Sequence, residues 1–258
     1  MAGFTATDWL TRLKSLRSEA TAGLVQILYP ACCHLCGAPL AQDADFFCPS
    51  CRTGLLTDPT PSCPRCAGTV GPFANTSGGC VQCREESFAF DTALRLGSYD
   101  GVLRDAVLRL KQHTGEGLAE LIGELWAERD RERLCSLAVD AVVPVPLHWW
   151  RRWRRGYNQA AAIARGLAQQ LQIRCFPSAL RRLRNTPDQP SQSPAGRRDN
   201  VRGAFVVRRR AGLHGRTILL VDDVMTTGAT AHEAARALRS AGAARVFVAA
   251  LARAGASA

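Results

Sequence analysis

The stretch that decides the fold is TILLVDDVMTTGAT, residues 217–230. It opens with the aliphatic run ILLV at 218–221, which is typical of a strand buried on both faces of a parallel sheet. Asp222 and Asp223 follow at the point where we expect this strand to end. The turn behind them, called here the phosphate turn, is made of Thr226, Thr227, Gly228, Ala229 and Thr230. The Ala-rich segment 231–240 then has the composition of a helix.

A strand that leads through such a turn into a helix predicts a phosphate-binding site. The first N–H groups of a helix have no partner within the helix, and the helix dipole favours an anion there. Asp222 and Asp223 add acceptors for sugar hydroxyls or for a bridging Mg²⁺. The alternative is that the acids close a sheet edge and the threonines cap a helix. The turn of hydroxyl residues and glycine directly behind the acids favours the phosphate site, and no Walker A pattern lies near it.

Residues 217–230 resemble the phosphoribosyl-pyrophosphate signature of type I phosphoribosyltransferases, which has a hydrophobic run, two acids, two apolar residues and T-T-G-x-T. The resemblance implies that Asp222 and Asp223 are the catalytic acids, binding the ribose hydroxyls directly or through Mg²⁺. It implies that the phosphate turn wraps the 5′-phosphate. Purine-type relatives place an acid at the first position of the turn, where this chain has Thr226. No general base is therefore visible, and the sequence supports ligand binding better than turnover.

The positive charge of the chain is concentrated in one block. The formal net charge is +11, yet residues 151–216 hold sixteen arginines against Asp188 and Asp199, and the remainder is slightly acidic. Such a block indicates a phosphate-handling surface or a nucleic-acid footprint.

The N-terminal segment predicts an amphipathic helix over residues 1–29, ending before Pro30. Its charged residues interrupt the apolar core that a signal peptide needs, and no run of about 18 apolar residues predicts a membrane span. We therefore expect a cytoplasmic protein.

Residues 30–86 hold most of the cysteines and predict a double zinc ribbon. Four C-x-x-C pairs are separated by 11, 11 and 13 residues. Each pair points two thiolates at one centre, and two pairs complete a tetrahedral site. We expect sequential pairing into a first tetrad and a second tetrad, that is, Cys33, Cys36, Cys48 and Cys51, then Cys63, Cys66, Cys80 and Cys83.

Several alternatives for the cysteines stay open at this point. The pairs could interleave, and Cys32 and His34 are spare candidates at the first site. Disulfides or redox C-x-x-C pairs are further possibilities, although four pairs in a chain without an export signal favour structural metal. Closed thiolate sites leave no open coordination position, so we expect the ribbons to dock to the main domain, to a partner or to nucleic acid.

From residue 90 to 258, stretches typical of strands and of helices alternate, which predicts a mainly parallel α/β sheet with helices on both faces. Strands are expected at 92–99, 139–145, 204–207, 217–221 and 245–251, and helices at 102–112, 117–133, 158–171 and 231–240. Residues 185–200 have no periodicity and predict a long loop.

Over nearly its whole length the chain resembles the ComF family, competence-associated proteins with a zinc-ribbon head on a phosphoribosyltransferase domain. The block PVPLHWWRRWRRGYNQA at 144–160 is similar to the P-V-P-L…R-G-[FY]-N-Q block of that family. Thr186, Gln189, Arg197, Asn200 and the sequence GAF at 203–205 follow its T-x-x-Q…R-x-x-N…G-A-F segment. Residues 99–116 resemble its Y-to-K-x-x-G-D segment, with one extra residue and Glu116 in place of Asp, and Gln192 departs from a usually apolar position.

The resemblance implies a larger site around the phosphate turn. Pyrophosphate would lie near Val145 and Pro146, held by Arg154, Arg155 and Asn158, unless these residues form only a solvated basic face and a helix cap. The loop 185–200 would close over the ligand, with Arg197 or Arg198 reaching the phosphates. Lys111 and His113 would line the entrance, and a plain surface turn is the alternative for them.

Three functions compete. The first is Mg²⁺-dependent transfer of a phosphoribosyl group from phosphoribosyl pyrophosphate. The second is handling of single-stranded DNA with the DNA-uptake machinery, as the ComF resemblance implies, because Trp149, Trp150, Trp153 and Tyr157 alternate with arginines in a pattern suited to stacking on bases. Core packing is the alternative for these aromatic residues, and we expect it for at least one tryptophan. The third function is a metal-stabilised adaptor that docks another protein.

Overall fold

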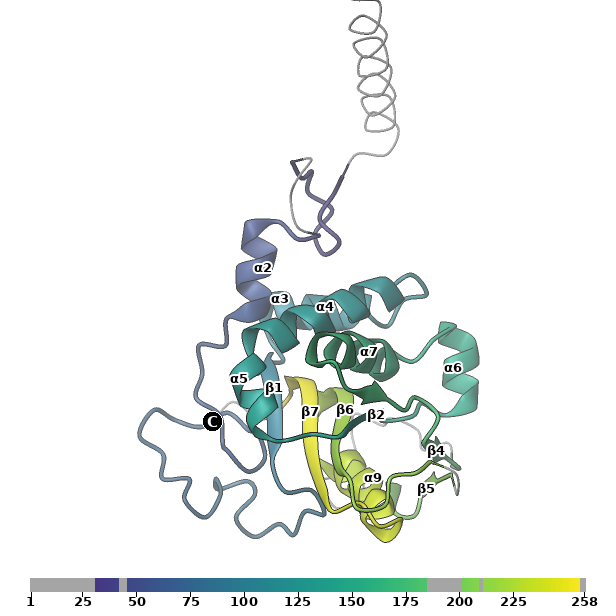
Figure 1. Ribbon diagram of the computed structural model, residues 1–258. Coiled ribbons are helices and arrows are strands. Elements are labelled where there is room, and N and C mark those ends of the chain that lie inside the picture. Colours follow the sequence, from purple (N-terminus) through teal and green to yellow (C-terminus); the bar gives the residue numbers. More distant parts are fainter. Residues whose placement is uncertain (1–30, 42–45, 185–200, 209–210, 256–258) are drawn as a thin grey trace, which may run out of the picture. The chain divides into compact units, whose positions relative to one another are not determined.

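The computed structural model describes residues 31–41, 46–184, 201–208 and 211–255 (Figure 1). The chain divides into two compact units, residues 1–52 and 53–258, and the division falls within helix α2 (Pro49–Leu56). In the first unit, a tight turn is closed by an antiparallel bridge between Cys32 and Pro39. The N-terminal helix predicted over residues 1–29 lies outside the described residues, and the predicted domain boundaries stay predictions.

A five-stranded parallel sheet forms the centre of the second unit. Its spatial order is β1 (Ala93–Ser98), β7 (Arg245–Arg253), β6 (Thr217–Met225), β2 (Ala141–Pro144) and β3 (Arg174–Cys175). The two central strands, β6 and β7, are nine residues long and carry the near-continuous apolar runs expected where both faces are covered. The predicted mainly parallel α/β sheet is confirmed.

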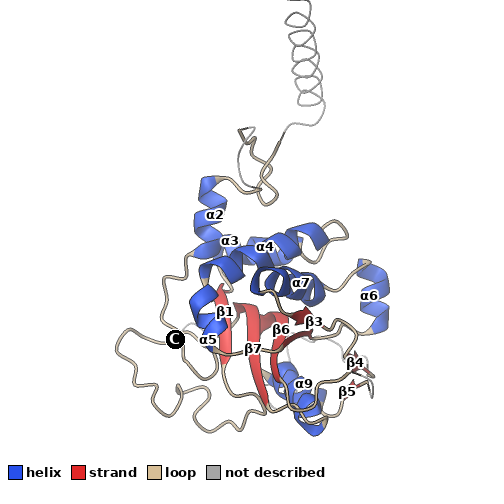
Figure 2. Cartoon of the chain, in the orientation of Figure 1, coloured by secondary structure: helices blue, strands red, loops and turns tan. Residues whose placement is uncertain are grey.

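Helices cover both faces of this sheet (Figure 2). One face carries α3 (Gly101–Arg109), α4 (Glu116–Arg129) and α7 (Gln159–Leu171), and the other carries α9 (Ala229–Ser240). The single helix predicted at 117–133 is divided at Asp130 into α4 and the short α5 (Arg131–Ser136). None of the helices in the described ranges is long and apolar enough to cross a bilayer.

Two glycines set the closeness of α4 and α7. A Cβ atom on Gly123 would collide with the carbonyl oxygen of Ile163, and one on Gly166 would collide with the carbonyl oxygen of Glu120. Because neither residue has a side chain, the two helix backbones approach closely along this line. Helix α7, which covers one face of the sheet, is thereby held close against α4.

Three further short elements belong to the second unit. Helix α6 (Trp149–Arg155) lies between β2 and α7 in the chain, and β4 (Leu180–Arg182) pairs antiparallel with β5 (Phe205–Val207). Strand β5 matches the strand predicted at 204–207, whereas α6, β3 and β4 were not predicted. The predicted loop 185–200 connects β4 to the following turn and lies outside the described residues.

Candidate functional site

The strand that carries the two acids is longer than predicted. β6 continues through Asp222 and Asp223 to Met225, and Asp222 pairs with Ala250 while Val224 pairs with Ala252. The prediction that the strand ends before the acids is therefore wrong, because β7 is equally long and offers hydrogen-bond partners to the end. Although they occupy successive strand positions, the two carboxylates lie close enough to interact, since the charge of Asp223 and a side-chain hydrogen bond with it both act on Asp222.

Asp222 is the more buried of the two acids, with 9% of its surface exposed. Its Oδ1 accepts a hydrogen bond from the backbone N–H of Asp223 at 2.9 Å, and Asp223 Oδ1 accepts one from Val224 at 2.8 Å. Burial, together with the neighbouring charge of Asp223, raises the pKa of Asp222 well above its usual range. An opposite charge close by favours the ionised form of such a group, so this acid is suited to meet a cation.

The phosphate turn begins directly after β6 and ends on the first turn of α9. Gly228 has φ +82°, and a Cβ there would lie 3.4 Å from the Phe88 ring, so glycine is the residue that fits. The backbone N–H of Ala229 donates to Thr227 Oγ1 at 3.4 Å. The N-terminus of a twelve-residue helix, with the positive end of its dipole, therefore lies immediately behind the acids.

The predicted pyrophosphate half lies on the neighbouring strand. Val145, just past the end of β2, donates its N–H to the carbonyl oxygen of Val221 at 2.8 Å. Asn158 Nδ2 in turn donates to the carbonyl oxygen of Val145 at 3.0 Å. The structure therefore brings Asn158 and the residues after β2 alongside the strand that carries the acids.

The turn between α3 and α4 is bonded to Tyr157, the residue that precedes Asn158. The Tyr157 hydroxyl donates to the carbonyl oxygen of Leu110. Burial raises the pKa of Tyr157, Glu116 and Asp223 add to the rise, and Arg155 opposes it, so all three charges act on this hydroxyl. Lys111 is exposed in this turn, and its predicted role at the entrance stays a prediction.

The predicted arginines are placed differently from one another. Arg155 is half-buried, and its charge acts on Tyr157, as noted above. The Arg154 guanidinium is exposed and lies over the Trp150 ring, 5.9 Å from its centroid. Arg197 lies outside the described residues.

Helix α6 presents its aromatic residues to solvent. Trp149, Trp150 and Trp153 are 69%, 44% and 80% exposed. The prediction that at least one of these tryptophans packs in the core is wrong, because α6 has no buried residue. Figure 1 shows α6 set apart from the sheet, at the edge of the second unit. Arginines occupy the other positions of the helix.

Sequence reasoning assigned no site role to three polar residues, Gln159, His148 and Arg182. Gln159 is 1% exposed, and within the described residues neither of its amide atoms has a hydrogen-bond partner. Burial lowers the pKa of His148, and the charges of Arg182 and Arg151 lower it further, while Arg182 also acts on Asp222. Gln159 could have been found, because it lies in the block 144–160. Arg182 could not, because it depends on the unpredicted strand β4.

A cavity of about 430 Å³ adjoins the phosphate turn. Thr227 and Ala229 form part of its wall, and the remaining lining residues are Glu86, Ser87, Phe88, Arg202, His232, Glu233 and Arg236. His232 Nδ1 accepts the N–H of Ala89 at 3.1 Å, so the neutral ring carries its proton on Nε2. Burial acts to raise the pKa of Glu233, but hydrogen bonds from Arg236 and from the N–H of Gly203 lower it overall.

The cysteines form two tetrads in sequential order, as predicted, and the four sulfurs of each lie within 4.8 Å of one another. Ligand sulfurs about 2.3 Å from a tetrahedral zinc are about 3.8 Å apart. The closest Sγ pairs are 3.7 Å apart in the first tetrad (Cys36–Cys48) and 3.6 Å in the second (Cys66–Cys80). No disulfide joins any cysteine in the described residues, and Cys32 and His34 belong to neither group. Both tetrads thus fit a structural zinc ion.

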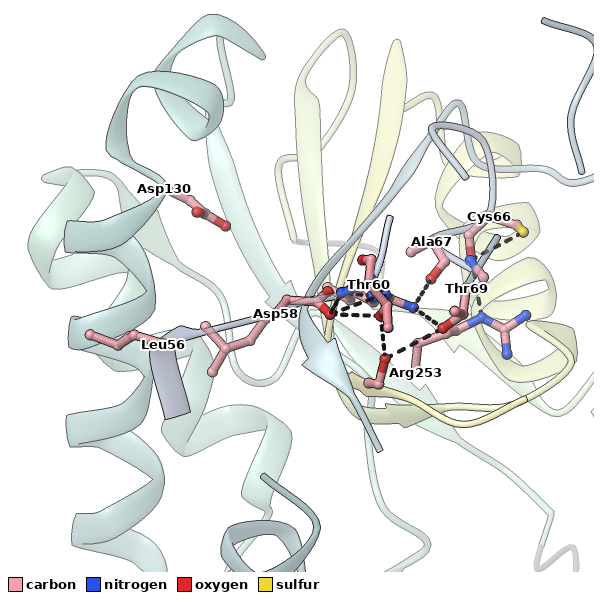
Figure 3. A network of polar contacts seen from close by, with 12 residues as sticks. Leu56, Asp58, Thr60, Cys66, Ala67, Thr69, Asp130 and Arg253 are labelled. Carbon is pink, nitrogen blue, oxygen red and sulfur yellow. Dashed lines mark hydrogen bonds and ion pairs between the residues drawn. The ribbon is translucent and has the colours of Figure 1, made fainter. Parts of the chain in front are cut away.

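The second tetrad is tied to the sheet by two buried arginines (Figure 3). Arg95 on β1 forms an ion pair with Asp58 at 2.7 Å and donates to the carbonyl oxygens of Thr60 and Ala67 at 3.0 and 3.1 Å. Arg253 at the end of β7 donates to the carbonyl oxygen of Cys66 at 3.1 Å. The segment carrying the second tetrad is therefore part of the same compact unit as the sheet.

Comparison with known proteins agrees with this architecture. The family model of the phosphoribosyl transferase domain matches residues 154–258. Competence protein F of Haemophilus influenzae is 30% identical over 236 residues, covering 86% of this chain and 96% of that protein. DNA utilization protein YhgH of Escherichia coli (strain K12) is 31% identical over 222 residues, covering 85% and 95%.

Among solved structures, the allosteric regulatory enzyme of purine biosynthesis matches with a TM-score of 0.37 and 24% identity. The match covers 53% of this chain and only 26% of that enzyme. The match to Competence protein F over 86% of this chain, the transferase domain and the two cysteine tetrads together identify the family. The chain therefore belongs to the ComF family.

Proposed function

We propose that the second unit binds phosphoribosyl pyrophosphate together with Mg²⁺. The observation that carries this proposal is the continuity of Asp222 and Asp223 with the N-terminus of α9, next to a strand whose end is bonded to Val221. The phosphate turn would hold the 5′-phosphate through its backbone N–H groups. Val145, Arg155 and Asn158 would meet the pyrophosphate, and Arg154, Lys111 and Arg197 remain candidates for further phosphate contacts.

The acids suit a magnesium ion shared with the ligand. Mg²⁺ is commonly held by one or two carboxylates together with phosphate oxygens and water. Asp222 and Asp223 offer two carboxylates on one strand, and the raised pKa of Asp222 favours a partner that supplies positive charge. When bound, the ion would neutralise the charge on the pyrophosphate. Turnover is not part of the proposal, because Thr226 offers no general base.

Isothermal titration calorimetry tests this proposal. We expect phosphoribosyl pyrophosphate to bind wild-type protein in the presence of Mg²⁺, and Asp222→Asn or Asp223→Asn to weaken binding at least about tenfold. Asp91→Asn is the matched control, because Asp91 lies at the other end of the sheet and pairs with Arg239. An absence of heat from wild type would refute the ligand.

A second candidate function is binding of single-stranded DNA during DNA uptake, carried by the exposed tryptophans of α6. Aromatic faces stack on unpaired bases with little dependence on sequence, and neighbouring arginines supply phosphate contacts. The names of two relatives, a competence protein and a DNA utilization protein, support a role linked to DNA. We place this function in the cytoplasm, where proteins of the uptake machinery would be its partners.

Fluorescence anisotropy with a labelled oligonucleotide tests the second candidate. We expect Trp153→Ala to weaken binding by about 1–3 kcal/mol, and affinity to fall steeply with salt. Phe73→Ala is the control, because Phe73 is 99% exposed but has no arginine beside it in the sequence. Equal losses in the two variants would refute a specific role for α6.

A further inference from the structure

Arg253 is a buried cation without a carboxylate partner in the described part of the chain. It is 6% exposed, and its guanidinium donates three hydrogen bonds, all of them to backbone carbonyl oxygens. Arg95, the other buried arginine of this region, differs in that Asp58 neutralises it. A buried guanidinium needs both hydrogen bonds and a compensating charge. The groups that lie on either side of Arg253 therefore indicate its role.

One side of Arg253 faces the second tetrad. Its Nε donates at 3.1 Å to the carbonyl oxygen of Cys66, a member of that tetrad (Figure 3). A metal-bound cysteine is a thiolate, so four of them around a divalent ion carry a net charge of about −2. The loaded second tetrad is thus the compensating charge for Arg253.

The other side of Arg253 faces the start of the phosphate turn. Its Nη1 donates at 3.2 Å to the carbonyl oxygen of Met225, the last residue of β6 and the one before Thr226. Met225 and Arg253 are also register partners across the sheet, and Ala254 donates its N–H to the same carbonyl oxygen at 2.9 Å. Two donors, one of them charged, therefore fix the carbonyl oxygen of Met225, the residue directly before the phosphate turn.

Met225 also supports the turn from within. Its sulfur lies 3.8 Å from the position of a Cβ on Gly228, the residue with positive φ at the N-terminus of α9. Phe88, which follows the second tetrad in the chain, lies against the same position at 3.4 Å. A shift of Met225 would therefore move the backbone that is offered to a phosphate group.

We propose that Arg253 is a positioning residue, which holds the phosphate turn in its binding conformation and uses the loaded second tetrad as its counter-charge. This inference deepens the proposed function and rests on it for the nature of the ligand. It means that the second tetrad contributes to ligand affinity through a single side chain.

The test compares Arg253→Met and Arg253→Lys with Arg95→Met in the zinc-loaded full chain. Arg95 also joins the ribbon to the sheet, through Asp58, Thr60 and Ala67, but none of the hydrogen bonds found for it in the described residues goes to Met225. Arg95→Met is thus the matched control, because it weakens the joint between the ribbon and the sheet and leaves the phosphate turn intact. Hydrogen–deuterium exchange of a peptide spanning 225–230 reports on the turn without any ligand.

We expect Arg253→Met to raise exchange in this peptide by about tenfold and to weaken binding of ribose 5-phosphate by about tenfold. Binding of magnesium pyrophosphate should stay within about twofold of wild type, because that group would contact the other half of the site. Arg253→Lys keeps the charge but not the planar fork, so we expect an intermediate effect. Arg95→Met should leave exchange at 225–230 and both affinities unchanged under conditions where the protein remains folded.

Wild-type exchange at 225–230 in Arg253→Met would overturn the inference, and so would an equal rise in Arg95→Met. If Arg253→Met does not fold, Arg253→Lys decides, and wild-type exchange in that variant overturns the inference. A wild-type protein that binds no ribose 5-phosphate, while Arg253→Met still loosens the turn, would refute the proposed ligand and leave the positioning role standing. If wild type and Arg253→Met bind ribose 5-phosphate equally well and their 225–230 peptides exchange at the same rate, the positioning role would be refuted and the proposed ligand would stand.

Discussion

The two cysteine tetrads are built on the same turn, thirty residues apart. The bridge between Cys32 and Pro39 repeats as a bridge between Ser62 and Thr69. In each turn the first cysteine donates its N–H to the residue five positions later, Cys33 to Ala38 at 2.7 Å and Cys63 to Gly68 at 2.8 Å. The local chemistry of metal binding is therefore the same in the two compact units.

Their surroundings differ. In the first tetrad Cys36 is exposed and Cys48 half-buried, whereas all four cysteines of the second are buried and pack against Val70 and Phe88. The second tetrad also lies against Arg253, and the residues around it bond to Arg95. The comparison teaches that one motif can close a small unit by itself or serve as an internal support of a larger one. Four predictions test this difference.

The largest effect is expected from removing one ligand of each tetrad. Cys66→Ser should lower the free energy of unfolding of the second unit by more than about 4 kcal/mol, because a structural metal contributes directly to folding. Cys36→Ser should change it by less than about 0.5 kcal/mol. Urea unfolding followed by circular dichroism measures both, with metal analysis confirming the loss of one zinc in each variant. Equal destabilisation would show that the tetrads are equivalent supports.

The next effect concerns the joint between the second tetrad and the sheet. Arg95→Met leaves Asp58 without its partner, so we expect a loss of about 3–5 kcal/mol, as for other broken buried pairs. Arg104→Met is the control, because its 3.8 Å pair with Asp105 is exposed and should contribute less than about 1 kcal/mol. Urea midpoints at constant slope measure the difference. Similar losses would mean that the joint contributes no more than a surface pair.

A smaller effect, dependent on pH, is expected from Asp222. A raised pKa means that the folded state binds a proton more tightly than the unfolded state, so stability falls as pH rises from about 4 towards the raised pKa. Asp222→Asn should remove this slope and make the second unit more stable than wild type at pH 7. Asp222→Asn should not change zinc release from the first tetrad, followed at the same pH values. A slope that persists in the variant would locate the titrating group elsewhere.

The smallest effect concerns one position shared by the two turns. Gly37 has φ +77° with open space around it, and Ala67 occupies the equivalent position at φ +54°. Gly37→Ala should cost about 1 kcal/mol of strain, measured as weaker zinc binding by the first tetrad. Ala67→Gly should be nearly neutral in urea unfolding, because relief of about 1 kcal/mol is offset by about 0.8 kcal/mol of lost methyl burial. A large loss in Ala67→Gly would mean that packing of this methyl group dominates.

Much of the sheet could be predicted because its strands carry their own signal. The aliphatic runs of β2, β6 and β7 and the Ala-rich α7 have the composition and length of buried elements. β3 and β4 have two and three residues, too few for a periodic pattern, and α6 has no buried face to create one. The end of β6 was misplaced because its last four residues are held by the length of β7, which lies outside the local sequence.

The same distinction applies to the candidate site. The phosphate turn and the cysteine tetrads are local motifs, and their spacing in the chain is enough to recognise them. The family resemblance implied that Val145 lies beside the site, and the structure bonds Val145 to Val221 on the strand that carries the acids. Arg182, Arg202 and Arg253 reach their places only through tertiary packing, so no pattern in the sequence distinguishes them from the many other arginines.

The order of the strands has a consequence for how the chain is made. Among the strands in the described residues, β7 comes last in the chain, yet it lies in the sheet between β1, which comes first, and β6. A ribosome-bound chain that has not yet exposed residues 245–253 therefore has two separate edges where a continuous sheet belongs, and these edges are open to wrong pairing. Zinc capture by the second tetrad during synthesis would precede this last pairing step. The sheet is then completed only when β7, the strand that carries Arg253, has been synthesised.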